Sequence, residues 1–584
     1  MVWEVGSNNQ KNVALGLILA LVLSLNLFVF TPLSIYLGNS QEFITPLTNL
    51  LGWWAIPTIS LLLVLMLVGM VCPANWYRRY LVLLASVSLL VWIQSNLLVW
   101  DYGLLDGRSI DWASMSWQGW VDGLTWVVVI AAGLLFSIRV FVVFSQAAVL
   151  LFIVQAIQLL YGVYSIQSQP ALQTKFDQAG MVEIVASFSA EENVLHLVLD
   201  GFQSDIFDEL LQHPVIGPDY RQKLSGFTFY RETLGIFPYT RFAVPAYLSG
   251  QIYDNTQPKN EFIGQALAGK SLFTVASSAG MELDVASIEY WAPLYAKGNV
   301  TNSYVIPEGG HGTEFEFRLA NTAKLIDLAL FRAAPHFLKR KIYYNQRWLI
   351  TPLLMDTEYL QFLYFAHTKF LNEIVDRMDA NRITPTYKYI HVMNTHNPMV
   401  VDAECRYAGG AIRTDRASLL NQSKCTLDTV MTMLDKMQEQ GVYENSLIIL
   451  HGDHGGWVPH SGYQPDRVST HREIPYWAVS VSSPLLAIKP PRTNGDIVIS
   501  DRLVSLTDIP DTVAEIMNWP QQFGGRSVLT VGEDELRARH FYLYEWQKNA
   551  WETDFAGPIH EFEISGRHYE SAWLPKNILM PGVE

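Results

Sequence analysis

The sequence predicts a multi-span helical membrane domain of about five helices, followed by an α/β sandwich domain. Long apolar stretches fill roughly the first 165 residues, whereas nearly all the charge lies after them. In the charged part, short apolar runs alternate with helical patterns, as they do in α/β folds. Several of these runs end next to Asp or His, which are common metal ligands. A chain of 584 residues is too long for one compact core, so at least two domains are expected.

Five apolar stretches are candidates for membrane-spanning helices. None carries a formal charge, and four are long enough, or nearly so, to cross about 30 Å of hydrocarbon. The remaining one, Gly123–Ile138, is short, and only Arg139 separates it from the last stretch. As one helix these two would measure about 63 Å, so a helical hairpin that turns near Arg139 is the better interpretation. The other four stretches are Val13–Leu37, Leu50–Cys72, Tyr80–Trp100 and Val140–Tyr164.

The basic residues of the short loops indicate the direction of these helices. With five spans, one side has only Arg108, in a loop that also carries four Asp residues. Because Lys and Arg are enriched in cytoplasmic loops, the N-terminus is expected in the cytoplasm and everything after Tyr164 outside it. The basic residues on the cytoplasmic side would be Lys11, Arg78, Arg79 and Arg139.

Charge and cysteine content limit the partners and the compartment. A net charge of −15 argues against a nucleic-acid partner, since no basic stripe is available to neutralise phosphates. Cys405 and Cys425 lie 20 residues apart in the charged part, which would suit a disulfide outside the cytoplasm. Two unpaired buried thiols are the alternative.

Three apolar runs predict strands of a parallel sheet. Val194–Leu199 reads as a buried strand that ends at Asp200, and Tyr387–Met393 and Ser446–His451 read as two more. A helical pattern over Leu427–Gln440 precedes the last strand. Open sheets of this kind hold ligands beyond the carboxyl ends of their strands.

These patterns divide the chain into a membrane domain (1–165), a polar linker (166–192), the α/β domain (193–528) and a C-terminal extension packed on it (529–584). Within the third part, Leu328–Trp348 mixes basic, aliphatic and aromatic residues. This segment is expected either to lie on the membrane surface or to pack on its own domain as an ordinary amphipathic segment. Pro335 would kink it or divide it in two.

The candidate site residues lie in four segments that follow these strands or a turn. Asp453 and His454, with Asp200, offer three ligands for Zn²⁺ or Mn²⁺. Thr240 would then supply the reacting oxygen, because a cation favours the alkoxide of a hydroxyl that is otherwise a poor nucleophile. His396 follows the second strand and is a further candidate for catalysis. His460 and His471 are alternative candidates for one more catalytic histidine, downstream of His454, and His471 is preferred. His196 and His451 are assigned to the core.

As a set, these motifs resemble the alkaline-phosphatase superfamily in its sulfatase-like branch. The layout is similar to that of lipoteichoic acid synthases and lipid A phosphoethanolamine transferases. The resemblance implies a sulfatase/alkaline-phosphatase-like sandwich in which Asp200, Thr240, Asp453 and His454 share one divalent metal. It also implies that His396 contacts the substrate phosphate. Thr240 stands ten residues before Gly250 and five before Pro245, as the family nucleophile does.

The sequence also departs from this family, and two of the departures bear on the reaction and on the metal. The position that sulfatases convert to formylglycine holds Thr240, followed by Arg241, which disfavours sulfate ester hydrolysis by that route. Asn394 stands where a two-metal enzyme would have an extra Asp near His396, which disfavours a complete second metal site.

The resemblance implies a phosphotransferase of the bacterial inner (plasma) membrane whose catalytic domain faces the periplasm. It would move phosphoethanolamine or phosphoglycerol from a membrane phospholipid to an envelope glycan or lipid, through a phosphothreonine at Thr240. The first alternative is a hydrolase of phosphodiesters or sulfate esters with the same site. The second is a non-catalytic, metal-stabilised envelope protein, which would have no use for Thr240 beside the ligands.

Overall fold

A computed structural model describes most of the chain, which divides into two compact units. One unit comprises Met1–Thr174 and His311–Gln361, and the other comprises Lys175–Gly310 and Phe362–Glu584. Residues 168–179 of the predicted linker lie outside the described residues. The described residues are 2–38, 47–102, 105, 110, 112–135, 137–167, 180–288, 295, 299–306, 314–343, 348–354, 363–520, 523–546 and 553–582.

The first unit is helical and contains five candidate membrane spans, as the sequence predicts. The spans are Val13–Gly38, Leu50–Val71, Ala74–Asn96, Ser116–Leu135 and Ser145–Tyr164. Large apolar side chains such as Leu67, Met70 and Leu160 are exposed on them, which suits helices that face lipid. The helices are α1 (Val2–Leu25), a π-helical turn η1 (Asn26–Phe30), α2 (Thr31–Gly38), α3 (Leu47–Val71), α4 (Ala74–Asn96), α5 (Ser116–Leu135) and α6 (Ser137–Gln167).

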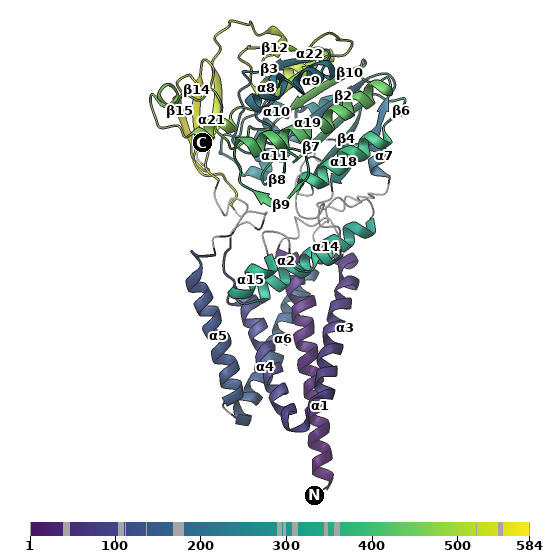
Figure 1. Cartoon of the computed structure of the whole chain (residues 1–584), viewed down its shortest axis with the longest axis vertical. Coiled ribbons are helices and arrows are strands. Elements are labelled where there is room, and N and C mark those ends of the chain that lie inside the picture. Colours follow the sequence, from purple (N-terminus) through teal and green to yellow (C-terminus); the bar gives the residue numbers. More distant parts are fainter. Residues whose placement is uncertain are drawn as a thin grey trace. The chain divides into compact units, whose positions relative to one another are not determined.

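Three further helices of this unit come from the middle of the sequence: α14 (Glu314–Ala333), α15 (His336–Tyr343) and α16 (Thr351–Leu354). These helices include most of the amphipathic segment Leu328–Trp348. Pro335 lies between α14 and α15, so it divides the segment in two, which is one of the two effects predicted for it. In Figure 1, α14 and α15 (teal) lie across one end of the apolar helices, and they contact α2, α3, α4 and α5. The structure groups this segment with the apolar helices, whereas the sequence analysis assigns it to the α/β domain.

A buried carboxylate joins these helices to the spans. Asp122 of α5 accepts hydrogen bonds from Gln94 Nε2 (3.0 Å), Trp100 Nε1 (2.7 Å) and the backbone N–H of His336 (2.8 Å). Arg332 Nε donates to the carbonyl of Ser95 (2.8 Å). A buried carboxylate persists only where its hydrogen bonds are satisfied, so the contacts of Asp122 fix α15 against α4 and α5.

The second unit is built on an eight-stranded mixed sheet in the order β12-β3-β11-β10-β2-β7-β4-β5. The run from β10 to β5 is parallel, whereas β11 pairs antiparallel with β10 and with β3. The strands are β2 (Asn193–Leu199), β3 (Thr228–Tyr230), β4 (Glu282–Ile288), β5 (Asn302–Ile306), β7 (Thr386–Val392), β10 (Ser446–His451), β11 (Leu486–Lys489) and β12 (Val498–Ser500).

Helices cover both faces of this sheet, as the predicted sandwich requires. Alternate residues of β2 enter different cores: Val194 and Val198 pack with α10, α11, α12 and α22, whereas Leu195 and Leu197 pack with α8, α18 and α19. The helices are α7 (Met181–Ala186), α8 (Ser204–Gln212), α9 (Gly217–Lys223), α10 (Thr240–Ser249), α11 (Lys259–Ala268), α12 (Leu272–Ser278), α18 (Leu363–Arg377), α19 (Arg416–Glu439), α20 (Pro465–Val468), α21 (Tyr476–Val481) and α22 (Ile509–Ile516), with the short 3-10 turns η3 (Leu506–Asp508) and η4 (Val528–Thr530).

Smaller sheets complete the unit. β13 (Arg539–Leu543), β14 (Ile559–Ile564) and β15 (Leu574–Leu579) form an antiparallel sheet, which shares a core with α21. The two-stranded pairs are β1 (Ser187–Ser189) with β6 (Asp379–Arg382) and β8 (Met399–Val401) with β9 (Tyr407–Ile412). The predicted disulfide is present between Cys405 and Cys425, and it joins the β8–β9 connection to α19.

Candidate metal and catalytic centre

Two neighbouring parallel strands bring the predicted metal ligands to one edge of the sheet. Asp200 follows the last residue of β2 directly, and Asp453 and His454 follow β10 after one glycine. β2 and β10 pair in parallel, with His451 opposite Val198, so their carboxyl ends meet. Both strands consist entirely of buried residues, which holds the ends in place. The site thus lies where open α/β sheets bind ligands.

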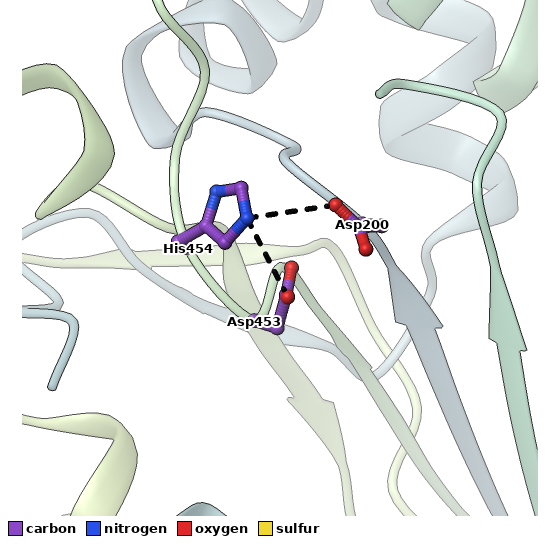
Figure 2. A group of neighbouring side chains, drawn as sticks. All are labelled: Asp200, Asp453 and His454. Carbon is purple, nitrogen blue, oxygen red and sulfur yellow. Dashed lines mark ion pairs between the residues drawn. The ribbon is translucent and has the colours of Figure 1, made fainter. Parts of the chain in front are cut away.

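The three side chains form one buried cluster (Figure 2). His454 Nε2 lies 3.6 Å from Asp200 Oδ1 and 3.6 Å from Asp453 Oδ2. One ligand atom from each residue lies within 4.8 Å of the others, and each side chain is at most 2% exposed. A single small cation can therefore contact all three residues.

Glycines next to the ligands make this approach possible. Gly201 has φ +72°, a left-handed conformation that glycine adopts without strain, and its backbone N–H donates to Asp453 Oδ1 (3.1 Å). At Gly455, a Cβ atom would lie 2.1 Å from the backbone oxygen of Ser480. Only glycine fits there without a shift of the chain that carries His454.

The donor chemistry of the cluster fits a divalent cation. His454 Nδ1 donates to the carbonyl of Gly455 (2.8 Å), so its Nε2 carries the lone pair in the neutral ring and faces the two carboxylates. Asp200 Oδ1 and Asp453 Oδ2 are buried and have no hydrogen-bond partner in the part of the chain that the structure describes. Buried carboxylate oxygens normally have partners, and a cation bound to one imidazole and two carboxylates would supply them.

The electrostatics are dominated by the two buried carboxylates. Burial alone would raise the pKa of Asp200, but the charge of His396, a hydrogen bond with His391 and the charge of His454 lower it below its ordinary value. Burial would lower the pKa of His454, but the charges of Asp453 and Asp200 raise it. The pocket therefore favours positive charge at the position between these residues.

Thr240 is the first residue of α10, and its side chain contacts the cluster. Its hydroxyl Oγ1 donates to Asp200 Oδ2 at 3.2 Å, and the side chain is only partly buried. The first backbone N–H groups of a helix lack partners within it and favour an anion nearby. A substrate phosphate at Thr240 would therefore meet a favourable field.

His391 contacts a member of the cluster, and the sequence analysis does not single it out. Its Nε2 lies 3.2 Å from Asp200 Oδ2, and its Nδ1 lies 3.0 Å from the hydroxyl of Tyr295. If the tyrosine donates to Nδ1, Nε2–H donates to the carboxylate, and this arrangement orients Asp200. The residue lies within the fully buried strand β7, where an imidazole is hard to distinguish from a core residue by sequence.

The remaining predicted histidines differ in their surroundings. His396 lines a cavity next to the cluster together with Gly201 and Trp457, and its Nδ1 donates to the carbonyl of Asn397 (2.7 Å). His471 is exposed, and no interaction with the cluster is found for it among the described residues. The competing His460 is buried and stacks on Tyr569 at 4.2 Å.

The histidines assigned to the core do lie there. His196 Nε2 and His451 Nε2 are 2.7 Å apart, and both residues are fully buried between β2 and β10.

Comparisons with known proteins agree with the motifs. Residues 335–519 match the Sulfatase family model, a range that includes His396, Asp453, His454 and His471 but neither Asp200 nor Thr240. No curated protein matches the chain by sequence.

Several solved structures are similar to this chain at low identity. The phosphonate monoester hydrolase SpPMH from Silicibacter pomeroyi is 12% identical, with a TM-score of 0.39, and the match covers 66% of this chain and 88% of that chain. The lipoteichoic acid synthase LtaP from Listeria monocytogenes is 10% identical, with a TM-score of 0.36 and coverages of 68% and 91% in the same order. The C-terminal periplasmic domain of EcEptC from Escherichia coli is 11% identical, with a TM-score of 0.36 and coverages of 62% and 94%. Likeness at this level says nothing about the reaction or the substrate. The match over residues 335–519 identifies a sulfatase-like enzyme domain in this chain, as the motifs predict.

Proposed function

We propose that the protein is a metal-dependent phosphotransferase that moves a phosphoalcohol group, phosphoethanolamine or phosphoglycerol, from a membrane phospholipid to a cell-envelope glycan or lipid. One observation carries this proposal: the Thr240 hydroxyl lies 3.2 Å from Asp200, a member of a buried cluster of three metal-ligand residues. A nucleophile beside such a cluster suits phosphoryl transfer through a covalent intermediate.

Asp200, Asp453 and His454 would hold the divalent cation, Zn²⁺ or Mn²⁺. When bound, the cation would favour the ionised form of the Thr240 hydroxyl and offset negative charge on the phosphoryl group. His391 holds Asp200 in the orientation that this arrangement needs.

In the first step, Thr240 Oγ1 attacks phosphorus, and the bond from phosphorus to the diacylglycerol oxygen breaks. Diacylglycerol leaves with the proton that the Thr240 hydroxyl loses, and the head-group phosphate remains on Thr240. In the second step, an acceptor hydroxyl attacks the same phosphorus, the bond between phosphorus and Oγ1 breaks, and Thr240 regains the proton that the acceptor hydroxyl loses. We assign His396 to contact the phosphate. We assign His471 as the catalytic histidine downstream of His454.

The membrane spans support a lipid donor. One span is enough to tether a soluble enzyme, whereas five candidate spans suit a protein that handles a bilayer substrate. The excess of Lys and Arg on one side favours a catalytic domain outside the cytoplasm, in the periplasm, where glycan hydroxyls are available.

The test is the release of diacylglycerol from mixed bacterial phospholipids by the purified full-length protein with a divalent metal. We expect release by the wild type and none by the Thr240→Ala variant, together with a head-group phosphate adduct on the Thr240 peptide in single-turnover reactions. If no lipid yields diacylglycerol but a soluble phosphodiester or sulfate ester turns over, the hydrolase alternative replaces this proposal.

A further inference from the structure

A chain of three buried tyrosine hydroxyls leads away from the metal-ligand cluster. The hydroxyl oxygens of Tyr247 and Tyr389 lie 2.6 Å apart, and those of Tyr389 and Tyr295 lie 3.2 Å apart. The hydroxyl of Tyr295 lies 3.0 Å from Nδ1 of His391, whose Nε2 lies 3.2 Å from Asp200 Oδ2. We call Tyr247, Tyr389 and Tyr295 the tyrosine chain. All three residues are fully buried, which shields these hydrogen bonds from bulk water.

The carboxylate at one end determines the direction of every hydrogen bond in this arrangement. An ionised carboxylate only accepts, so His391 Nε2–H donates to Asp200 and, in the neutral ring, Nδ1 accepts. Tyr295 therefore donates to Nδ1, and because each hydroxyl has one proton, Tyr389 donates to Tyr295 and Tyr247 donates to Tyr389. Burial raises the pKa of each of the three tyrosines well above its ordinary value, so each keeps the proton that it donates. All the donors thus point toward Asp200.

The far end of the tyrosine chain lies on the helix that carries the nucleophile. Tyr247 comes seven residues after Thr240 in α10, and side chains seven residues apart in a helix project to the same side. Thr240 Oγ1 donates directly to Asp200 Oδ2 (3.2 Å), the same oxygen that lies next to His391 Nε2. The hydrogen bonds therefore close a loop from Asp200 through His391 and the tyrosine chain to α10, and back through Thr240.

A closed loop restrains the nucleophile against the metal ligand more strictly than one contact does. Apolar packing also holds α10 in the core, but such contacts are non-directional, whereas hydrogen bonds specify how the helix is rotated about its axis. The bond at Tyr247 is a second, directional attachment of α10, two turns away from the bond at Thr240. Strict placement matters because a shift of about 1 Å in a reacting group costs on the order of 100-fold in rate.

We propose that the tyrosine chain consists of positioning residues, which act through His391 on Asp200 and through α10 on Thr240. This inference deepens the proposed function and rests on it for the roles of Asp200 and Thr240. Its consequence for metal binding does not depend on the transfer reaction.

The test is a set of Tyr→Phe variants of the full-length protein in detergent, because phenylalanine keeps the ring and removes only the hydroxyl. Affinities for Zn²⁺ and Mn²⁺ are measured by competition with a chelator, and kcat and KM are measured with a soluble phosphodiester. We expect Tyr247→Phe and Tyr389→Phe each to lower metal affinity and kcat by about tenfold, as loss of an outer partner of a metal ligand does. KM should not change, because these buried hydroxyls do not contact the substrate.

A double-variant cycle distinguishes positioning from a general loss of stability. A loop that is already broken at His391 is not broken further at Tyr389, so Tyr389→Phe should not lower metal affinity or kcat again in the His391→Gln background. Two independent structural losses would instead multiply. If His391→Gln does not fold, the same cycle with Tyr247→Phe in its place decides.

The matched control is Tyr443→Phe, which removes another buried hydroxyl. Tyr443 is 2% exposed, and its hydroxyl donates to the carbonyl of Ser225 (2.6 Å); neither residue belongs to the loop. This variant should lower the thermal unfolding midpoint but keep wild-type metal affinity and kcat. The inference is refuted if Tyr389→Phe also keeps either wild-type metal affinity or wild-type kcat, or if the effects multiply in the double variant. Absence of diacylglycerol release from every lipid, with the metal-affinity cycle as expected, would refute only the proposed transfer reaction.

Discussion

Replacing Gly455 by alanine should separate the metal ligands without touching any of them. The added Cβ would lie 2.1 Å from the backbone oxygen of Ser480 and 2.9 Å from that of Ser483, both closer than non-bonded atoms allow. Backbone atoms cannot rotate away as a flexible side chain can, so the strand end must move by about 1 Å. Overpacking of this kind typically costs about 1–3 kcal/mol. The next residue back is His454, so the movement is transmitted to the ligand cluster.

We expect the Gly455→Ala protein to bind less than half of the wild-type metal content. Turnover of an artificial phosphodiester should fall at least about 100-fold, because a misplacement of about 1 Å costs on that order. Elemental analysis by plasma mass spectrometry gives the metal content, and a steady-state assay gives the turnover.

The control for this experiment is Gly441→Ala. Gly441 has φ +71° and no atom within 4 Å of the added Cβ, so the substitution costs only the strain of a left-handed residue, about 1–2 kcal/mol. It should lower the thermal unfolding midpoint while metal content and turnover stay at wild-type values. Wild-type metal content in Gly455→Ala would refute the argument that packing at this glycine positions His454.

Three further predictions concern other parts of the chain. Non-reducing peptide mapping should recover Cys405 and Cys425 in one linked pair, and two alkylatable thiols would contradict the pairing. Replacement of both cysteines by serine should lower the free energy of unfolding by roughly 3 kcal/mol, as expected for a loop of this length. His391→Gln should lower kcat/KM by about 10–100-fold and weaken metal binding, as loss of a partner of a metal ligand does; a wild-type metal titration would argue against a positioning role. Asp122→Leu should lower the thermal midpoint in detergent, because one buried donor and two partly buried donors lose their acceptor. A buried donor without a partner costs about 1–3 kcal/mol. An unchanged midpoint would contradict the anchoring of α15.

The spans and the ligand cluster are the parts that sequence reasoning predicts best. A bilayer requires long uncharged stretches, and a parallel sheet requires short apolar runs, so both leave a local pattern. Asp200 and Asp453 were recognisable because each follows such a run at the carboxyl end of a strand. The ends of β2 and β10 meet because neighbouring parallel strands run in the same direction, so their carboxyl ends lie at one edge of the sheet.

Features that depend on distant contacts were not predictable in the same way. The predicted α/β domain included residues 311–361, whereas the structure groups them with the N-terminal helices. That grouping rests on contacts such as the one between Asp122 and the backbone of His336, which are 214 residues apart. The proposed role of His391 depends on its contact with Asp200, which follows the neighbouring strand β2. No local pattern encodes such neighbours.

The most direct test of the central claim is the comparison of metal content and turnover in wild type, Thr240→Ala and Thr240→Ser. Thr240 supplies the reacting oxygen in this account, while Asp200, Asp453 and His454 hold the ion. The alanine variant should therefore fold, insert and keep most of its metal, but turn over no phosphodiester; the serine variant, which keeps the hydroxyl, should retain measurable turnover. Turnover by Thr240→Ala within about tenfold of wild type, a barrier change below about 1.4 kcal/mol, would contradict the assignment of Thr240 as the nucleophile.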